Sequence, residues 1–258
     1  MNTENNQNLF NKITDSINTL LNLIYPPVCR VCETQLDSYD KICICDACWK
    51  TFEQPLEPIC PKCGSELERP VQENKPCPNC PTPIYYNAAK AAFRHNGAVR
   101  KIIHEYKYNS IKEMSFPLGN FMAKHLHKHF DVYPSTIIAP VPLHWTRKLQ
   151  RGFNQSYLLS AIIGNLLNIP VEKYSLVRRK ITKTQQGLSR RERQHNLLGA
   201  FGVINPAAFL NKNIILIDDV MTTTSTVNEC AKMLKESGAA QVFAYCLARA
   251  VQSDITNA

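Results

Sequence analysis

Regularly spaced cysteines are the first residues of this chain that point to a specific chemistry. Eleven cysteines occur, and nine of them lie between Cys29 and Cys80. Eight form four Cys-x-x-Cys pairs, separated by 12, 11 and 13 residues. One such turn places two thiolates on a metal ion, and two turns complete a closed tetrahedral zinc site. The pattern predicts two structural zinc ions held by these ligands: Cys29, Cys32, Cys45, Cys48, Cys60, Cys63, Cys77 and Cys80.

The spacing leaves the pairing of these cysteines open. Sequential use of the pairs builds two tandem ribbons, whereas alternate use builds a cross-brace. Cys43 is left over, and it replaces Cys45 only by giving up the two-residue spacing to Cys48. We expect metal binding rather than disulfides, because residues 1–11 hold no Lys or Arg ahead of a cleavable apolar core.

A second chemical pattern lies in residues 214–226, which read IILIDDVMTTTST. Four apolar residues predict a buried strand with Asp218 and Asp219 at its carboxyl end, followed by a hydroxyl-rich turn into a helix. Ligands of open α/β sheets bind at that edge. The N–H groups and hydroxyls of the turn suit a phosphate monoester. Two adjacent carboxylates can accept hydrogen bonds from ribose hydroxyls, with Mg²⁺ bridging a diphosphate nearby.

This segment resembles the phosphoribosyl-diphosphate (PRPP) motif of type I phosphoribosyltransferases, in which two acids precede a Thr-Thr-Gly turn. The resemblance implies that Asp218 and Asp219 hold the ribose. It assigns the 5-phosphate to Thr222, Thr223, Thr224, Ser225 and Thr226. One position departs from the motif, since Thr224 stands where the family has glycine. A side chain there tightens the pocket or shifts the phosphate.

Cationic residues follow the second predicted strand and crowd a later loop. Residues 140–156 (PVPLHWTRKLQRGFNQS), 178–201 (RRKITKTQQGLSRRERQHNLLGAF) and 104–108 (HEYKY) resemble segments of the ComF family of bacterial competence proteins. With the cysteine pairs, this resemblance covers about residues 25–250. The cations that can reach a diphosphate or a DNA backbone are Lys107, Arg147, Lys148, Arg151, Arg178, Arg179, Lys180, Lys183, Arg190, Arg191 and Arg193.

Three segments must position these residues. We expect an amphipathic helix in residues 1–25, a double four-cysteine zinc-binding module in residues 26–86 and a phosphoribosyltransferase-like domain in residues 87–258. In the last, predicted strands near residues 88–93, 136–141, 213–217 and 241–247 alternate with helices near residues 98–108, 115–130, 154–167 and 226–237. This alternation predicts an α/β fold, a mostly parallel sheet of the type I phosphoribosyltransferase type behind an N-terminal zinc-ribbon module.

Charge divides the chain in the same place. The 258 residues carry a formal net charge of +9, but residues 1–86 hold 7 Lys/Arg against 11 Asp/Glu, and residues 87–258 hold 23 against 10. A cationic surface attracts polyanions, which favours a phosphate-rich partner for the second part. No apolar run reaches the roughly 20 residues of a membrane-spanning helix, so we expect a cytoplasmic protein without a membrane span.

The ComF resemblance implies a competence protein that supports natural transformation by handling incoming single-stranded DNA, with a PRPP-binding pocket. The partners it implies are single-stranded DNA, PRPP or a related phosphoribosyl ligand, and a competence helicase or other uptake proteins. The alternative is an active phosphoribosyltransferase of nucleobase or nucleotide salvage. Enzyme activity stays open at this point because no acceptor-base site is recognisable in the sequence.

Overall fold

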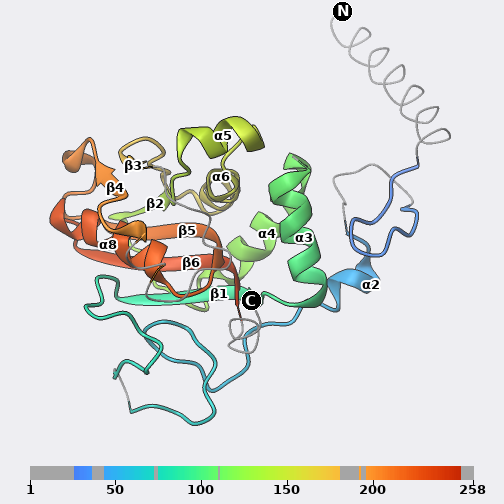
Figure 1. Ribbon diagram of the computed structural model, residues 1–258, viewed down its shortest axis with the longest axis horizontal. Helices are drawn as coiled ribbons and strands as arrows, with labels where there is room; N and C mark the ends of the chain where they lie inside the picture. Colours follow the sequence, from blue (N-terminus) through green and yellow to red (C-terminus); the bar gives the residue numbers. More distant parts are fainter. Residues whose placement is uncertain are drawn as a thin grey trace, which may run out of the picture. The chain divides into compact units, whose positions relative to one another are not determined.

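The computed structural model describes residues 26–36, 44–72, 75–109, 111–180, 192 and 196–250 (Figure 1). The predicted helix of residues 1–25 therefore lies outside the described residues. Contacts divide the chain into two compact units, residues 1–51 and residues 52–258. None of the described helices has the length and apolarity needed to cross a membrane.

The described part of the first unit contains Cys29, Cys32, Cys45 and Cys48 and the short helix α2 (Asp46–Trp49). An isolated bridge between Val28 and Gln35 closes its first turn. So few residues bury little apolar surface, and a module of this kind depends on metal ligation for its fold.

The second unit alternates strands and helices along the chain, as Figure 1 shows. Its elements are β1 (Ala88–Arg94), α3 (Gly97–Tyr108), η1 (Lys112–Met114), α4 (Ser115–Leu126), β2 (Thr136–Pro140), α5 (Trp145–Arg151), α6 (Gln155–Leu167), β3 (Leu176–Arg178), β4 (Phe201–Val203), η2 (Pro206–Ala208), β5 (Asn213–Met221), α8 (Ser225–Glu236) and β6 (Gln241–Arg249).

Four of these strands form a parallel sheet in the order β1-β6-β5-β2. The central strands β5 and β6 are buried along most of their length, as expected for strands covered on both faces. On one face Ile214 and Leu216 belong to a core cluster that includes Val227, Cys230 and Leu234 of α8 and all four cysteines from Cys60 to Cys80. Helices α4 and α6 contact each other and the sheet.

The register of β5 differs from the prediction in one consequential way. The strand continues through Met221 instead of ending before Asp218, because β6 extends alongside it to Arg249. Its other neighbour, β2, pairs only as far as Pro140 opposite Ile217. Asp218 and Asp219 therefore lie just beyond the last residue of β5 that pairs with β2.

The predicted α/β fold with a mostly parallel sheet and an N-terminal four-cysteine module is confirmed. Helix α4 ends at Leu126, earlier than predicted. The sequence reading missed the helix α5 and the antiparallel pair β3–β4, which flanks the basic loop. The predicted boundary near residue 86 stays a prediction, although contacts group Cys60 to Cys80 with the α/β sheet.

Candidate metal centres and phosphate site

The eight paired cysteines form two four-cysteine groups, each using successive pairs. The first group is Cys29, Cys32, Cys45 and Cys48, and the second group is Cys60, Cys63, Cys77 and Cys80. Within each group the Sγ atoms all lie within 4.8 Å of one another. The structure therefore selects the sequential arrangement that spacing left open, and Cys43 lies outside the described residues.

Both groups fit a structural zinc ion. A zinc–sulfur bond of about 2.3 Å in tetrahedral geometry places neighbouring sulfurs about 3.8 Å apart. The Sγ atoms of Cys32 and Cys45 are 3.6 Å apart, and those of Cys60 and Cys80 are 3.7 Å apart. Four thiolates leave no open coordination position, so such a site is structural.

The two groups begin with the same turn, repeated 31 residues later in the chain. Cys29 N donates to Thr34 O at 2.8 Å, and Cys60 N donates to Ser65 O at 2.8 Å. The residue after the second cysteine has a positive φ in both turns, 65° at Glu33 and 70° at Gly64. The repeat therefore extends beyond the cysteine pairs to the backbone around them.

The second group is bonded into the α/β sheet. Ala89 N on β1 donates to Lys62 O at 2.7 Å. The buried guanidinium of Arg249, on β6, donates to Cys63 O and to Ser65 Oγ, each at 2.5 Å. A Cβ at Gly64 would lie 2.5 Å from Ala89 O, so only glycine fits this contact.

Asp218 and Asp219 are buried, just beyond the last pair of β5 with β2. Ser156 Oγ on α6 donates to Asp218 Oδ1 at 3.0 Å, and Asp219 N donates to the same oxygen at 2.9 Å. Burial and the neighbouring Asp219 charge raise the pKa of Asp218 to about 7, against the opposing effects of these hydrogen bonds and Lys107. Asp219 forms an ion pair with Lys107 on α3, with Nζ 3.0 Å from Oδ1.

The turn of residues 222–226, called the phosphate turn below, follows β5 directly. Its centre, Thr224, has φ 59° and ψ 0°, the left-handed conformation that favours glycine. Thr224 Oγ1 donates to Thr223 O at 2.6 Å and accepts from Tyr86 Oη at 3.3 Å. Thr223 Oγ1 and Ser225 Oγ lie 2.9 Å apart. The phosphate turn thus leads directly into α8, and its Thr223, Thr224 and Ser225 hydroxyls take part in hydrogen bonds within the protein.

Arginines approach the same edge of the sheet. Burial, followed by repulsion from Arg151, lowers the pKa of Arg147, and burial, followed by repulsion from Arg147, lowers the pKa of Arg178. Cys230, followed by Asp218, acts in the opposite direction on the pKa of Arg178. Such crowding of cations beside a carboxylate pair suits a ligand that carries several negative charges.

Helix α5 presents a surface of exposed apolar and cationic side chains. Trp145 and Leu149 are 62% and 75% exposed, and Lys148 is exposed beside them. Arg151 stacks over the ring of Tyr108, 5.5 Å from its centroid, and Tyr108 is 52% exposed. We call Trp145, Arg147, Lys148, Leu149, Arg151 and Tyr108 the α5 surface.

The two ends of the long basic loop are joined to the antiparallel strands β3 and β4. Arg178 lies over the Phe201 ring, with 5.3 Å from its Cζ to the ring centroid. Arg179 N donates to Ala200 O at 2.8 Å, and Lys180 Nζ donates to Leu198 O at 3.1 Å. The other predicted cations of the loop, Lys183, Arg190, Arg191 and Arg193, lie outside the described residues.

Four residues of these sites escaped the sequence reading, namely Tyr86, Ser156, Asn228 and Arg249. Each of them contacts a residue far away in the chain, so no local sequence pattern predicts its role. Asn228 is an example: its side chain accepts from Tyr85 N at 2.9 Å and donates to Pro83 O at 3.0 Å.

Comparison with known proteins assigns the family. Residues 20–81 match the model of the "Double zinc ribbon domain". "Competence protein F" of Haemophilus influenzae is 32% identical over 217 residues, which cover 80% of this chain and 90% of that protein. The chain belongs to the ComF family of competence proteins.

Other relatives of this ComF-family chain carry related names. "DNA utilization protein YhgH" of Salmonella typhimurium is 29% identical over 231 residues, covering 88% of this chain and 99% of that protein. "Competence protein ComFC" of Streptococcus pneumoniae is 29% identical over 211 residues, covering 81% and 89%. The family thus includes proteins named for competence and for DNA utilization.

Solved structures similar to the ComF-family chain include two that are named for phosphoribosyl chemistry. The glutamine PRPP amidotransferase of B. subtilis matches 56% of this chain and 30% of its own, with 17% identity and a TM-score of 0.38. The purine phosphoribosyltransferase of Pyrococcus horikoshii matches 52% and 70%, with 13% identity and a TM-score of 0.31.

Proposed function

We propose that this ComF-family chain handles single-stranded DNA during natural transformation and binds PRPP, or a related phosphoribosyl ligand, at the phosphate turn. The observation that carries the DNA part is the α5 surface. Exposed aromatic side chains interleaved with cations are the usual means of holding single strands, since bases stack on the rings while phosphates meet the charges. The names of the relatives, competence and DNA utilization proteins, support the same reading.

Exposure distinguishes the aromatic side chains that a DNA base could reach from those in the core. Trp145 and Tyr108 are more than half exposed, whereas Tyr106 and Phe153 are 0% and 6% exposed. Tyr106 instead donates its hydroxyl to Gln155 O at 3.2 Å. Stacking is therefore assigned to Trp145, because the Tyr108 ring already contacts Arg151 and His104. Arg147 and Lys148 would face the backbone of the strand.

The carboxylate pair and the phosphate turn support the phosphoribosyl part of the proposal. Asp218 and Asp219 would accept hydrogen bonds from two ribose hydroxyls, and the N–H groups of the turn would donate to the 5-phosphate. Mg²⁺, when bound with PRPP, would neutralise the diphosphate. Lys107 holds Asp219 at 3.0 Å, so it must shift or share that carboxylate when ribose enters.

Strand binding tests the DNA part directly. Replacing Trp145 with Ala should weaken binding of a fluorescent oligothymidylate by about tenfold, because one base–ring stack is worth about 1–3 kcal/mol. Tyr133, which is 50% exposed and bonded to Asp131, provides the matched control. Lys148→Ala should reduce the slope of log affinity against log salt by about 0.7. Equal affinities for Trp145→Ala and Tyr133→Ala would remove α5 from the binding surface.

Calorimetry with PRPP and Mg²⁺ tests the phosphoribosyl part. Binding should be lost in the double variant Asp218→Asn, Asp219→Asn.

The pH dependence of binding is a second test of the carboxylate pair. Because the pKa of Asp218 is raised to about 7, its protonated form stabilises the fold below the ordinary carboxyl pKa near 4, and this stabilisation is lost as pH rises through 7. The ribose hydroxyls of PRPP donate to the ionised form of Asp218. The affinity for PRPP should therefore rise about tenfold from pH 6 to pH 8. A flat profile would exclude Asp218 from the ligand contacts.

A phosphoribosyltransferase of nucleobase or nucleotide salvage is the second candidate, favoured by the paired carboxylates beside the phosphate turn. Such transfer needs mainly positioning and electrostatic stabilisation of a cationic ribose. Release of diphosphate from PRPP in the presence of free nucleobases would reveal this activity. Asp218→Asn should abolish the release while the protein stays folded. The proposed setting is the cytoplasm, with a competence helicase or other uptake proteins as partners.

A further inference from the structure

The centre of the phosphate turn carries a side chain in a conformation that favours glycine. Thr224 has φ 59°, and its hydroxyl is already used, since it donates to Thr223 O and accepts from Tyr86 Oη. Its side chain is 2% exposed. The hydroxyl of Thr224 is therefore engaged by two hydrogen bonds within the protein.

The partner of Thr224, Tyr86, comes from the segment that follows the second four-cysteine group. Tyr86 is 4% exposed and packs in one core cluster with Cys60, Cys63, Cys77 and Cys80. Asn228, on the first turns of α8, holds the same segment by two hydrogen bonds, to Tyr85 N and Pro83 O. The segment after Cys80 is thus bonded to the phosphate turn at one point and to the following helix at two.

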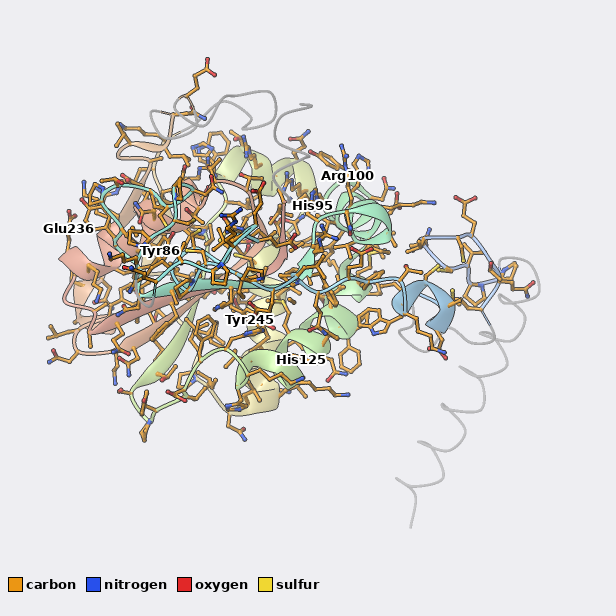
Figure 2. The ribbon with its side chains drawn as sticks, turned by 90° about the horizontal axis from the view of Figure 1, so that it is seen from below. Tyr86, His95, Arg100, His125, Glu236 and Tyr245 are labelled. Carbon is orange, nitrogen blue, oxygen red and sulfur yellow. The ribbon has the colours of Figure 1, made fainter. Side chains whose placement is uncertain are left out.

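Burial alone does not provide a tyrosine with such a bond. Tyr245 is fully buried in the same unit, and its hydroxyl has no hydrogen-bond partner in the described part of the chain. Figure 2 labels both tyrosines and shows that they lie at separate places in this unit. The hydrogen bond of Tyr86 therefore depends on the position of Thr224 and does not follow from burial alone.

We infer that Tyr86 is a positioning residue of the phosphate turn, and that the second four-cysteine group sets the conformation of the turn through it. The hydrogen bond offsets part of the strain of a threonine at positive φ, which explains how this chain dispenses with glycine at the position. That the turn binds a phosphate rests on the proposed function, whereas the coupling between Tyr86 and the turn does not.

Hydrogen exchange of the full, zinc-loaded chain tests the coupling without any ligand. Tyr86→Phe removes the hydroxyl and keeps the ring, so the amides of residues 222–227 should exchange about three- to tenfold faster, as expected for one lost hydrogen bond. Tyr245→Phe removes an equally buried hydroxyl and should leave these amides unchanged. Unchanged exchange in Tyr86→Phe, or equal effects of both variants, would overturn the inference.

A double-mutant cycle separates positioning from general loss of stability. Thr224→Ser keeps the acceptor for Tyr86, whereas Thr224→Gly removes it. Tyr86→Phe should accelerate exchange of the turn in the Thr224→Ser background and have no further effect in the Thr224→Gly background. The same acceleration in both backgrounds would show that Tyr86 acts on the fold in general and would contradict the inference.

Binding of ribose 5-phosphate, measured by calorimetry, connects the coupling to the ligand. Tyr86→Phe should weaken binding about three- to tenfold, and Tyr245→Phe should bind like the parent chain. Equal affinities of the two variants, with a parent chain that binds, would overturn the role of Tyr86 in ligand positioning. A parent chain that binds no ribose 5-phosphate would refute the phosphate site, and hydrogen exchange would then decide the coupling by itself.

Discussion

The two four-cysteine groups share a turn and a ligand geometry but differ in what surrounds them. In the first group Cys32 is exposed, Cys45 is partly exposed, and the unit around them is small. In the second group all four cysteines are buried in one cluster with residues of the parallel sheet and α8. A repeated metal motif therefore serves two purposes here, as the core of a small module and as part of the core of an α/β domain.

The residue after the second cysteine of the repeated turn reflects this difference in surroundings. Glu33 and Gly64 both have a positive φ, so both turns require the same backbone conformation. Glu33 is exposed and can carry a side chain at a cost in strain, whereas Ala89 O excludes a Cβ at Gly64. Packing against β1, rather than metal ligation, decides which residue fits. Four changes test how far the two groups differ.

The largest effect is expected from loss of one ligand in the second group. Cys63→Ser should lower the free energy of unfolding of residues 52–258 by more than about 4 kcal/mol, because it weakens a metal site that belongs to the domain core. Cys32→Ser should change it by less than about 0.5 kcal/mol. Hydrogen exchange of the β5 and β6 amides reports on this unit alone. Similar losses in both variants would remove the distinction between the groups.

A smaller loss is expected when the bond between the sheet and the second group is removed. Arg249→Met should lower the free energy of unfolding by about 3 kcal/mol, since Cys63 O and Ser65 Oγ lose a charged donor in a buried place. Arg100, an exposed arginine on α3, provides the control as Arg100→Met. Urea unfolding followed by circular dichroism measures both. A loss below about 1 kcal/mol for Arg249→Met would show that this contact does not fasten the group to β6.

The contact of Gly64 with β1 should contribute less than the Arg249 contact. Gly64→Ala should lower the free energy of unfolding by roughly 2 kcal/mol, because the added side chain is strained at positive φ and clashes with Ala89 O. Gly152→Ala separates the two causes, because Gly152 has φ 75° but nothing within 4 Å of an added Cβ. The difference between the two variants, read from thermal unfolding, is the contribution of the contact with β1. Equal losses of stability in the two variants would show that the contact of Gly64 with Ala89 O does not contribute.

The smallest effect is expected at the equivalent position of the first group. Glu33→Gly should relieve backbone strain and stabilise that module by about 0.5 kcal/mol, without changing the unfolding of residues 52–258. The measurement is the chelator concentration that removes half of the metal from the first group. A destabilised module would show that the contacts of Glu33 outweigh the strain of its backbone.

Much of the site followed from short spacings in the sequence. The Cys-x-x-Cys pairs predicted the eight cysteines that form the two four-cysteine groups, because such a turn brings two thiolates to one metal in any fold that contains it. Apolar residues followed by Asp218 and Asp219 predicted a buried strand that carries both carboxylates. Periodicity also located the main helices and strands, but it missed α5, whose seven residues include no buried ones.

Only the tertiary structure decided which cysteine pairs come together, that β5 continues to Met221, and that the second group belongs with the sheet. It also decided the contacts of Tyr86 with Thr224, of Lys107 with Asp219 and of Arg249 with Cys63, which span up to 186 residues of chain. Ligand spacing and burial patterns are local properties that a sequence displays directly. Contacts between distant residues depend on strand order and register, which local patterns do not encode.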